Sequence, residues 1–231
     1  MKLIHRLLRF LAPMAILATS IAPMPAAAES DDTRENLMVV VRESIGANKQ
    51  DDAFEPFGRL MAKMPDGREV VMDLAWWRFI GDMQVRFVFD GPQAMKNASR
   101  QDLARLDVLD FDHALALAMA NLERVYGAPT ASPWTGGVME VHGKSPDLDS
   151  SYVLDRHFWS TLLKEHPDGV VVAVPKRGGL LYAPLSDQTA VAGLRKGIGM
   201  LYTTSGHLRV SSALYLFKDD RWSVFQPPIQ P

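Results

Sequence analysis

Residues 110–127 read DFDHALALAMANLERVYG and carry the clearest helical pattern in the sequence. Their large apolar side chains recur at intervals of three and four residues, which places them on one face of an α-helix. Asp110 stands at the position of an N-cap, and Gly127 stands where a C-terminal stop is expected. We therefore predict a helix that packs on the core through one apolar face. That face is formed by Phe111, Leu115, Met119, Leu122 and Tyr126.

The region before this helix contains strand patterns. Residues 83–90 alternate apolar and polar side chains, which is typical of a half-buried β-strand. Residues 57–63 and 70–74 flank a Pro-Asp-Gly turn, and this arrangement predicts a β-hairpin.

Two further helices are expected in the same region. Ser99 and Asp102 have the spacing of a capping box, which predicts a short helix over 99–106. Residues 35–45 mix apolar and charged side chains without a clean period, and we expect a helix there as well.

The C-terminal half contains both strand and helix patterns. Pro, Gly, Ser and Thr dominate residues 129–137, so we expect a loop there. Apolar runs separated by turn residues predict two hairpins, and apolar stripes behind capping residues predict two helices. The predicted elements are a strand over 138–142, a helix over 149–164, a hairpin of 170–174 and 180–183, a helix over 189–202, and a hairpin of 208–217 and 222–225.

This order of elements lacks the regular alternation of strand and helix that a parallel sheet requires. The sequence therefore predicts an α+β fold, in which an antiparallel or mixed sheet is packed by helices within a single domain. We expect a signal peptide over 1–28, an N-terminal segment over 29–56, the α+β domain over 57–226 and a C-terminal tail over 227–231.

The first 28 residues have the three parts of a secretory signal peptide. Lys2, Arg6 and Arg9 form a basic start, residues 10–21 form an apolar run, and alanines at 26–28 form a small-residue cleavage pattern. A retained membrane anchor is the alternative, but the apolar run is shorter than the roughly 20 residues that span a bilayer. We therefore expect cleavage, a periplasmic or secreted protein, and no transmembrane segment in the mature chain.

The amino-acid composition limits the kinds of binding partner and of catalytic or metal site that the protein can have. Hydrophobic residues make up 47% and charged residues 23% of the 231 residues, which is ordinary for a globular protein. Three basic residues leave with the signal peptide, so 22 basic and 27 acidic residues give the mature chain a net charge of −5. No basic stripe is visible, and we expect no nucleic-acid partner. The chain has no cysteine, which excludes disulfides, thiolate metal ligands and cysteine nucleophiles.

Several landmarks from residue 83 onward share their order with a known family. They are the strand that ends at Asp90, Ala120-Asn121-Leu122 in the long helix, residues 151–159, VAVPKR at 172–177, and VSSALY at 210–215 before Trp222. In this order the chain resembles the YtpQ-like family, a group of mostly bacterial proteins of uncharacterised function. The resemblance implies a shared fold unit and supplies no mechanism. An acidic residue commonly follows the Pro-x-Arg element in that family, whereas this sequence has Gly178.

Motifs of common catalytic and cofactor sites are incomplete or absent. Gly143-Lys144-Ser145 matches only the end of a phosphate-binding loop, because Val138 stands where the first glycine of that motif belongs. The histidines do not form the His-Glu-x-x-His pair of a zinc peptidase, and no Gly-x-Ser-x-Gly nucleophile motif occurs. We therefore expect neither a metal nor a cofactor.

Two sets of residues remain as candidates for binding. Lys176 and Arg177 precede two glycines in a predicted hairpin turn, where exposed N–H groups and a guanidinium could hold a carboxylate or a phosphate. Trp76, Trp77 and Trp134 are not explained by core periodicity. Because adjacent tryptophans cannot face the same side of a strand, we expect one of them to be exposed or to lie under a loop. Such a residue would form a binding surface, and packing in the core or in a satellite cluster is the alternative.

These features predict a non-catalytic binding or interaction domain of the cell envelope, whose partner is a protein or a small ligand. The alternative is a hydrolase whose site is assembled from residues that are distant in the sequence. A pocket lined by two carboxylates, or by a histidine with a nucleophilic serine, would favour the hydrolase. A shallow apolar groove near the tryptophans would favour binding.

Overall fold

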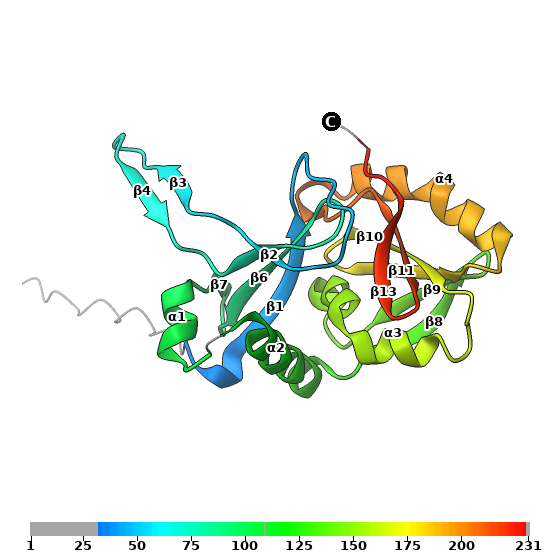
Figure 1. The fold of residues 1–231 in the computed structure, drawn as a ribbon, viewed down its shortest axis with the longest axis horizontal. Coiled ribbons are helices and arrows are strands. Elements are labelled where there is room, and N and C mark those ends of the chain that lie inside the picture. The colour runs from blue at the N-terminus through cyan, green and yellow to red at the C-terminus, as the bar shows by residue number, and fades with distance from the viewer. Residues whose placement is uncertain (1–31, 109, 230–231) are drawn as a thin grey trace, which may run out of the picture. The chain divides into compact units, whose positions relative to one another are not determined.

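Figure 1 shows a computed structural model of the protein, which describes residues 32–108 and 110–229. The predicted signal peptide over 1–28 lies outside the described residues. Asp31–Pro231 form one compact unit, which combines antiparallel sheets with helices. The predicted α+β class is therefore confirmed.

The first sheet is built on two long paired strands. β1 (Leu37–Glu43) pairs along its full length with β6 (Met83–Asp90). Two shorter strands, β5 (Trp76–Arg78) and β7 (Met95–Asn97), also pair with β6. β2 (Glu55–Pro56) pairs with β5 and completes the sheet, in which all these pairs are antiparallel.

β1 corrects the prediction of a helix over 35–45. Between residue 32 and the strand, the structure has a single turn of 3-10 helix, η1 (Arg34–Asn36). Residues 37–41 are all buried, so both faces of the strand lie in the interior. The three consecutive valines at 39–41 favour the extended conformation, because β-branched side chains pack well on a pleated surface.

The long helix predicted from the sequence is α2 (Phe111–Tyr126), and it packs on the first sheet. The side chain of Asp110 caps its N-terminus, and Gly127 takes the C-cap position with φ at 81°. Leu122 is fully buried, whereas the other four residues of the predicted apolar face are partly buried and pack against the core. The residues buried along the helix are Ala114, Ala118, Asn121 and Leu122.

Two local predictions for the region before α2 in the sequence are also confirmed. α1 (Arg100–Arg105) begins with the capping box, in which Ser99 and Asp102 exchange hydrogen bonds. The hairpin consists of β3 (Leu60–Lys63) and β4 (Glu69–Met72), which pair with each other. In Figure 1 it extends away from the other elements of the unit.

The second sheet has six strands in the order β13-β12-β10-β11-β9-β8. α4 (Gln188–Thr204) packs on one face, and the 3-10 segment η2 (Pro146–Leu154) and α3 (Arg156–Leu162) pack on the other. The strands are β8 (Thr130–Thr135), β9 (Val138–His142), β10 (Val170–Lys176), β11 (Gly179–Pro184), β12 (Leu214–Lys218) and β13 (Arg221–Gln226).

Three predictions for the C-terminal half were wrong in part. Residues 129–137 contain the edge strand β8, where a proline is tolerated because one side of the strand needs no partner. The helix predicted over 149–164 is divided into η2 and α3 at Asp155, whose side chain caps α3. The strand predicted over 208–217 is shorter, since η3 (Gly206–Leu208) and an irregular segment precede β12.

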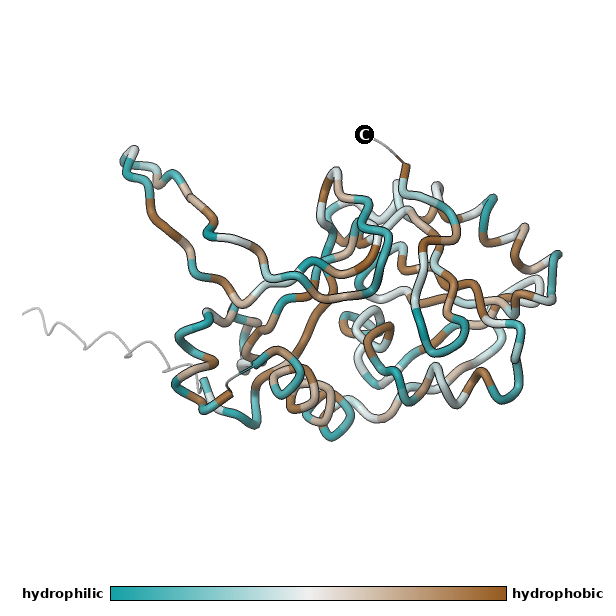
Figure 2. The backbone as a smooth tube through the Cα atoms, viewed as in Figure 1, coloured by the Kyte–Doolittle hydropathy of each residue, from teal (hydrophilic) through white to brown (hydrophobic). Residues whose placement is uncertain are grey.

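Two hydrophobic clusters form the interior. The larger cluster contains residues of both sheets, such as Val85 of β6 and Val172 of β10, together with Leu122 of α2. The smaller cluster lies between the second sheet and α4. Figure 2 shows apolar residues along β1 and β6, as expected for strands buried on both faces. Within residues 32–108 and 110–229, no helix is long and apolar enough to cross a membrane.

Candidate functional site

The five residues singled out from the sequence do not form one site. Trp77 is buried in the larger core. Trp134 is 45% exposed on the edge strand β8 of the second sheet, and Lys176 is exposed at the end of β10. Trp76 and Arg177 are half-buried, and both lie next to a third residue that the sequence analysis did not select.

Trp76 and Trp77 point to opposite faces of β5, as expected for neighbours in a strand. Trp77 faces α2, where its ring lies 5.0 Å from the ring of Phe111. On the face away from α2, the guanidinium carbon of Arg86 lies 3.7 Å from the centre of the Trp76 ring. The residue shared by the two half-buried candidates is therefore Arg86.

The face of the first sheet away from α2 forms the floor of a pocket of about 520 Å³, which we call the arginine pocket. Arg42 of β1 and Arg86 of β6 lie on this floor, and Arg177 contributes from the turn between β10 and β11. The remaining lining residues are Val40, Val88, Met95, Asn97, Asp147 and Leu208.

Backbone contacts fix the position of Arg177. Its N–H donates to the carbonyl oxygen of Leu208 at 3.0 Å, and its carbonyl oxygen accepts from the N–H of Ser150 at 2.9 Å. A Cβ atom on Gly178 would lie 2.4 Å from the carbonyl oxygen of Pro146, so this turn requires glycine. The turn therefore holds Arg177 in a defined place at the pocket.

The three guanidinium groups of the arginine pocket have no acidic partner in the described part of the chain, where none of them forms an ion pair. Burial, with repulsion from Arg177 and Arg86, lowers the pKa of Arg42 to about 10, and the charge of Asp147 only partly offsets this. Burial and repulsion from Arg177 lower the pKa of Arg86 to about 10 as well. The Nε atoms of Arg86 and Arg177 are buried without a hydrogen-bond partner among the described residues.

Aromatic side chains orient Arg86. Its guanidinium stacks on Trp76, and the ring of Phe57 meets the Trp76 ring edge-on at 6.4 Å between centroids. The guanidinium of Arg78 lies over Phe57 at 4.7 Å. Stacking of this kind uses the flat face of a guanidinium and leaves the N–H groups at its edge free to donate hydrogen bonds.

Sequence reasoning found Arg177 and Trp76 but missed Arg42 and Arg86. Arg86 had a detectable signal, because it stands on the polar side of the alternation over 83–90. Arg42 lies in the segment that was predicted as a helix, so the sheet face to which it belongs could not be assigned.

No family model, curated protein or solved structure matches this chain. The resemblance to the YtpQ-like family is not tested by these comparisons and stays a prediction.

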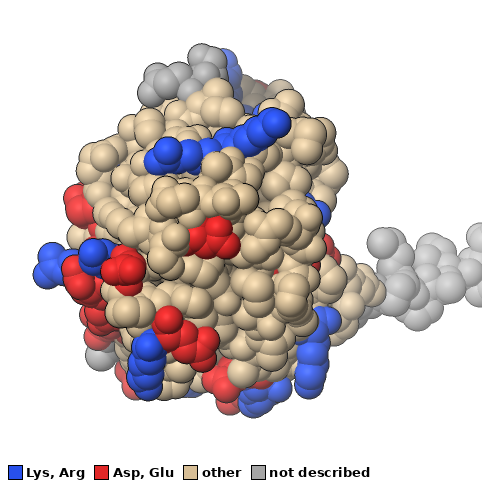
Figure 3. Space-filling model, turned by 90° about the vertical axis from the view of Figure 1, so that its right-hand side faces the viewer, with Lys and Arg blue, Asp and Glu red and all other residues tan. Residues whose placement is uncertain are grey.

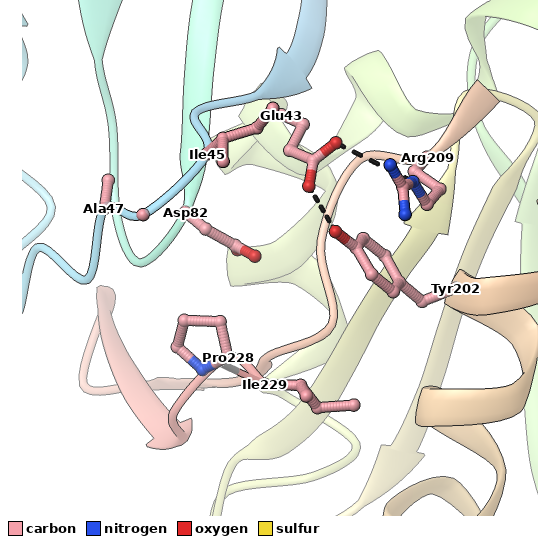
Figure 4. A pocket seen from close by; sticks show the side chains of 9 residues that line it. Glu43, Ile45, Ala47, Asp82, Tyr202, Arg209, Pro228 and Ile229 are labelled. Carbon is pink, nitrogen blue, oxygen red and sulfur yellow. Dashed lines mark hydrogen bonds and ion pairs between the residues drawn. The ribbon is translucent and has the colours of Figure 1, made fainter. Parts of the chain in front are cut away.

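A smaller pocket of about 140 Å³ lies at the end of β1, and we call it the acidic pocket (Figure 4). The Tyr202 hydroxyl donates to the carboxylate of Glu43, and Nε of Arg209 lies 3.9 Å from the second oxygen of that carboxylate. The carboxyl group of Asp82 points into the same space in Figure 4. The apolar part of the lining includes Ile45, Pro228 and Ile229.

Asp82 is held by donors from the second sheet and the segment before it. The Tyr215 hydroxyl donates to Oδ1 at 2.9 Å, the Ser211 hydroxyl donates to the same atom, and the N–H of Ser212 lies 3.4 Å from Oδ2. Burial raises the pKa of Asp82, and these hydrogen bonds offset the rise only in part. Gly81 permits the close packing, because a Cβ there would lie 2.5 Å from the Tyr215 hydroxyl.

The acidic pocket combines a carboxyl group of raised pKa with a second carboxylate, which is the kind of pair that general acid–base catalysis uses. Ser211 is fully buried and is therefore no accessible nucleophile. Among residues 32–108 and 110–229, no three His, Cys, Asp or Glu side chains are grouped so as to hold a metal ion.

Figure 3 shows the side of the unit formed by the second sheet and its helices. Most of this face is uncharged, basic side chains lie together near its top, and acidic and basic side chains lie side by side along its left and lower margins.

Proposed function

We propose that the protein is an exported, non-catalytic binding domain of the cell envelope, and that it recognises an anionic ligand in the arginine pocket. One observation supports this proposal above the others. Three guanidinium groups, Arg42, Arg86 and Arg177, line one pocket and have no carboxylate partner among the described residues.

Electrostatics favour an anion as the occupant. Partly buried charges are costly unless they are paired, and gathering like charges adds to the cost. The lowered pKa values of Arg42 and Arg86 reflect this cost. Groups perturbed in this way are concentrated at functional sites. A bound anion would accept charge-assisted hydrogen bonds from the guanidinium groups and supply the missing partner.

The first test measures thermal unfolding of the purified protein in inorganic phosphate and in chloride at matched ionic strength. Binding to the native state raises the unfolding free energy by about 2.7 kcal/mol at a ligand concentration of 100 times Kd. We expect phosphate to raise the unfolding midpoint of the unmodified protein and of Lys176→Gln, but not of Arg177→Gln. Lys176 is the matched control, because it is adjacent, exposed and outside the pocket lining. An equal rise in both variants would remove the arginine pocket from consideration.

Export rests on the pattern of residues 1–28. Ala26 and Ala28 occupy the small-residue positions before a cut, so we expect the mature chain to start at Glu29. N-terminal sequencing of the protein from the envelope fraction measures this directly. A chain that still starts at Met1 would contradict both the cleavage and the location.

The acidic pocket supports a second candidate, a hydrolase. Glu43, Asp82 and Tyr202 come from distant parts of the sequence and line one small pocket, and Asp82 has the raised pKa of a potential general acid. Its test is turnover of chromogenic esters, glycosides and phosphate esters by the purified protein. If the protein is a hydrolase, Asp82→Asn should lower the rate by about 100-fold or more, whereas Lys176→Gln should not change it.

A further inference from the structure

The lining of the arginine pocket is divided between charged and apolar residues. Arg42 and Arg86 lie together on the floor, and Val40 is the direct cross-strand neighbour of Arg86. Val88 lies two residues beyond Arg86 on the same face of β6 and opposite Asn97 of β7. Met95 and Leu208 extend the apolar part of the lining.

The charges of the lining exceed what a single negative charge can neutralise. The lining contains three guanidinium groups and one carboxylate, that of the exposed Asp147, so it carries two net positive charges. A ligand with one negative charge would leave half of this excess unbalanced. A doubly charged anion would balance it.

The three guanidinium groups also come from three separate elements, β1, β6 and the β10–β11 turn. A carboxylate offers two oxygen atoms, whereas a phosphate monoester offers three strong acceptor oxygens around one centre. A phosphate monoester therefore gives each guanidinium an acceptor of its own, and it is doubly charged above its second pKa of about 6.

The volume leaves room for more than an anionic group. About 520 Å³ falls within the range of pockets that bind whole small molecules, roughly 300 to 1,000 Å³. Val40 and Val88 are buried beneath the lining, whereas Met95 and Leu208 keep accessible surface and would contact the part of the ligand that carries no charge.

We propose that the ligand of the arginine pocket is a small phosphate monoester whose phosphoryl group contacts Arg42, Arg86 and Arg177 and whose apolar body lies against Met95 and Leu208. This inference rests on the proposed function and specifies the ligand of the same pocket. It predicts two separable contributions to affinity, one from the second negative charge and one from the apolar body.

Three probe ligands separate these contributions in calorimetric titrations at pH 8 and constant ionic strength. Phenyl phosphate has two charges and an apolar ring, benzenesulfonate has a similar shape and one charge, and inorganic phosphate has the charge without the ring. We expect phenyl phosphate to bind at least about tenfold more tightly than benzenesulfonate. Its second negative charge strengthens the hydrogen bonds that it accepts from the guanidinium groups. We expect it to bind several-fold more tightly than inorganic phosphate.

Variants assign each contribution to its residues. Arg177→Gln should reduce the advantage of phenyl phosphate over benzenesulfonate, and Met95→Ser should reduce its advantage over inorganic phosphate. Asp147→Asn should strengthen the binding of phenyl phosphate several-fold, because it removes the one acidic side chain of the lining. Lys176→Gln should change none of these affinities.

The outcomes distinguish this inference from the proposed function. Equal affinities for phenyl phosphate and benzenesulfonate would overturn the doubly charged group, and equal affinities for phenyl phosphate and inorganic phosphate would overturn the apolar body. In both cases an anion still binds and the proposed function stands. If none of the three anions binds to the unmodified protein, the proposed function fails together with this inference.

Discussion

Asp82 is a buried carboxyl group. It is stabilised by hydrogen bonds and not by a cation. Its donors are two hydroxyl groups and one backbone N–H, and it forms no ion pair within the described residues. Because burial raises its pKa above the ordinary value of 3.8, the native state binds a proton more tightly than the unfolded chain does. The contribution of Asp82 to stability is thus fully present below the unfolded pKa and is lost as pH rises through the native pKa.

This linkage predicts how Asp82→Asn responds to pH. The variant keeps an oxygen that can accept from Tyr215 and Ser211 but has no charge to bury. Its unfolding free energy relative to the unmodified protein should therefore rise between pH 4 and pH 8, by about 1.4 kcal/mol for each unit by which the native pKa is raised. Urea unfolding of both proteins across this range measures the difference. A difference that does not change with pH would contradict the raised pKa.

The arginine pocket shows how much of a site can be found from single residues. Arg177 and Trp76 were identified because a glycine-rich turn and adjacent tryptophans are local features of the sequence. Arg42 and Arg86 join them only through the antiparallel register of β1 and β6, which places Val40 opposite Arg86. Register depends on pairing between distant segments, so the sequence alone could not bring these arginines together.

Among the helices and strands, those whose ends are marked by local hydrogen bonds could be predicted from the sequence. Asp110 and Gly127 delimit α2, and Ser99 begins α1, as expected. β1 was mistaken for a helix because its conformation is determined by pairing with β6 and by burial of both faces. β8 was taken for a loop because its composition is that of a turn, and only its pairing with β9 makes it a strand.

The β3–β4 hairpin should contribute little to the stability of the unit. Within the described part of the chain its strands pair only with each other, and Met61 and Val71, which are direct cross-strand partners, are 59% and 49% exposed. We therefore expect the double substitution Met61→Ser and Val71→Ser to change the unfolding free energy by less than about 0.5 kcal/mol. The matched buried control is Leu122→Ala, which should cost about 2 to 5 kcal/mol. Urea unfolding measures both, and a loss above about 1 kcal/mol in the hairpin variant would show that these side chains pack against a partner.

At the scale of the whole unit, the two sheets are joined by a shared interior. The larger cluster includes Val85 of the first sheet, Val172 of the second sheet and Trp159 of α3. If either sheet unfolded, buried side chains of the other sheet would become exposed to solvent. The arginine pocket depends on the same arrangement, because Arg177 reaches the first sheet from a turn of the second.

The shared interior predicts that Asp31–Pro231 unfold in one cooperative transition. Leu122 lies in α2 against the larger cluster, and Leu194 lies in α4 within the smaller cluster on the far face of the second sheet. Each leucine replaced by alanine should lower the midpoint of the entire transition, because a cavity in either cluster destabilises the single native state. Tryptophan fluorescence and far-ultraviolet circular dichroism, followed in the same urea titration, should give superimposable curves for the unmodified protein and both variants.

If Leu194→Ala instead separates the two curves, the second sheet and α4 unfold independently of the first sheet. The positions of Arg42 and Arg86 relative to Arg177 would then not be fixed by a common core, which would weaken the case for a preformed arginine pocket.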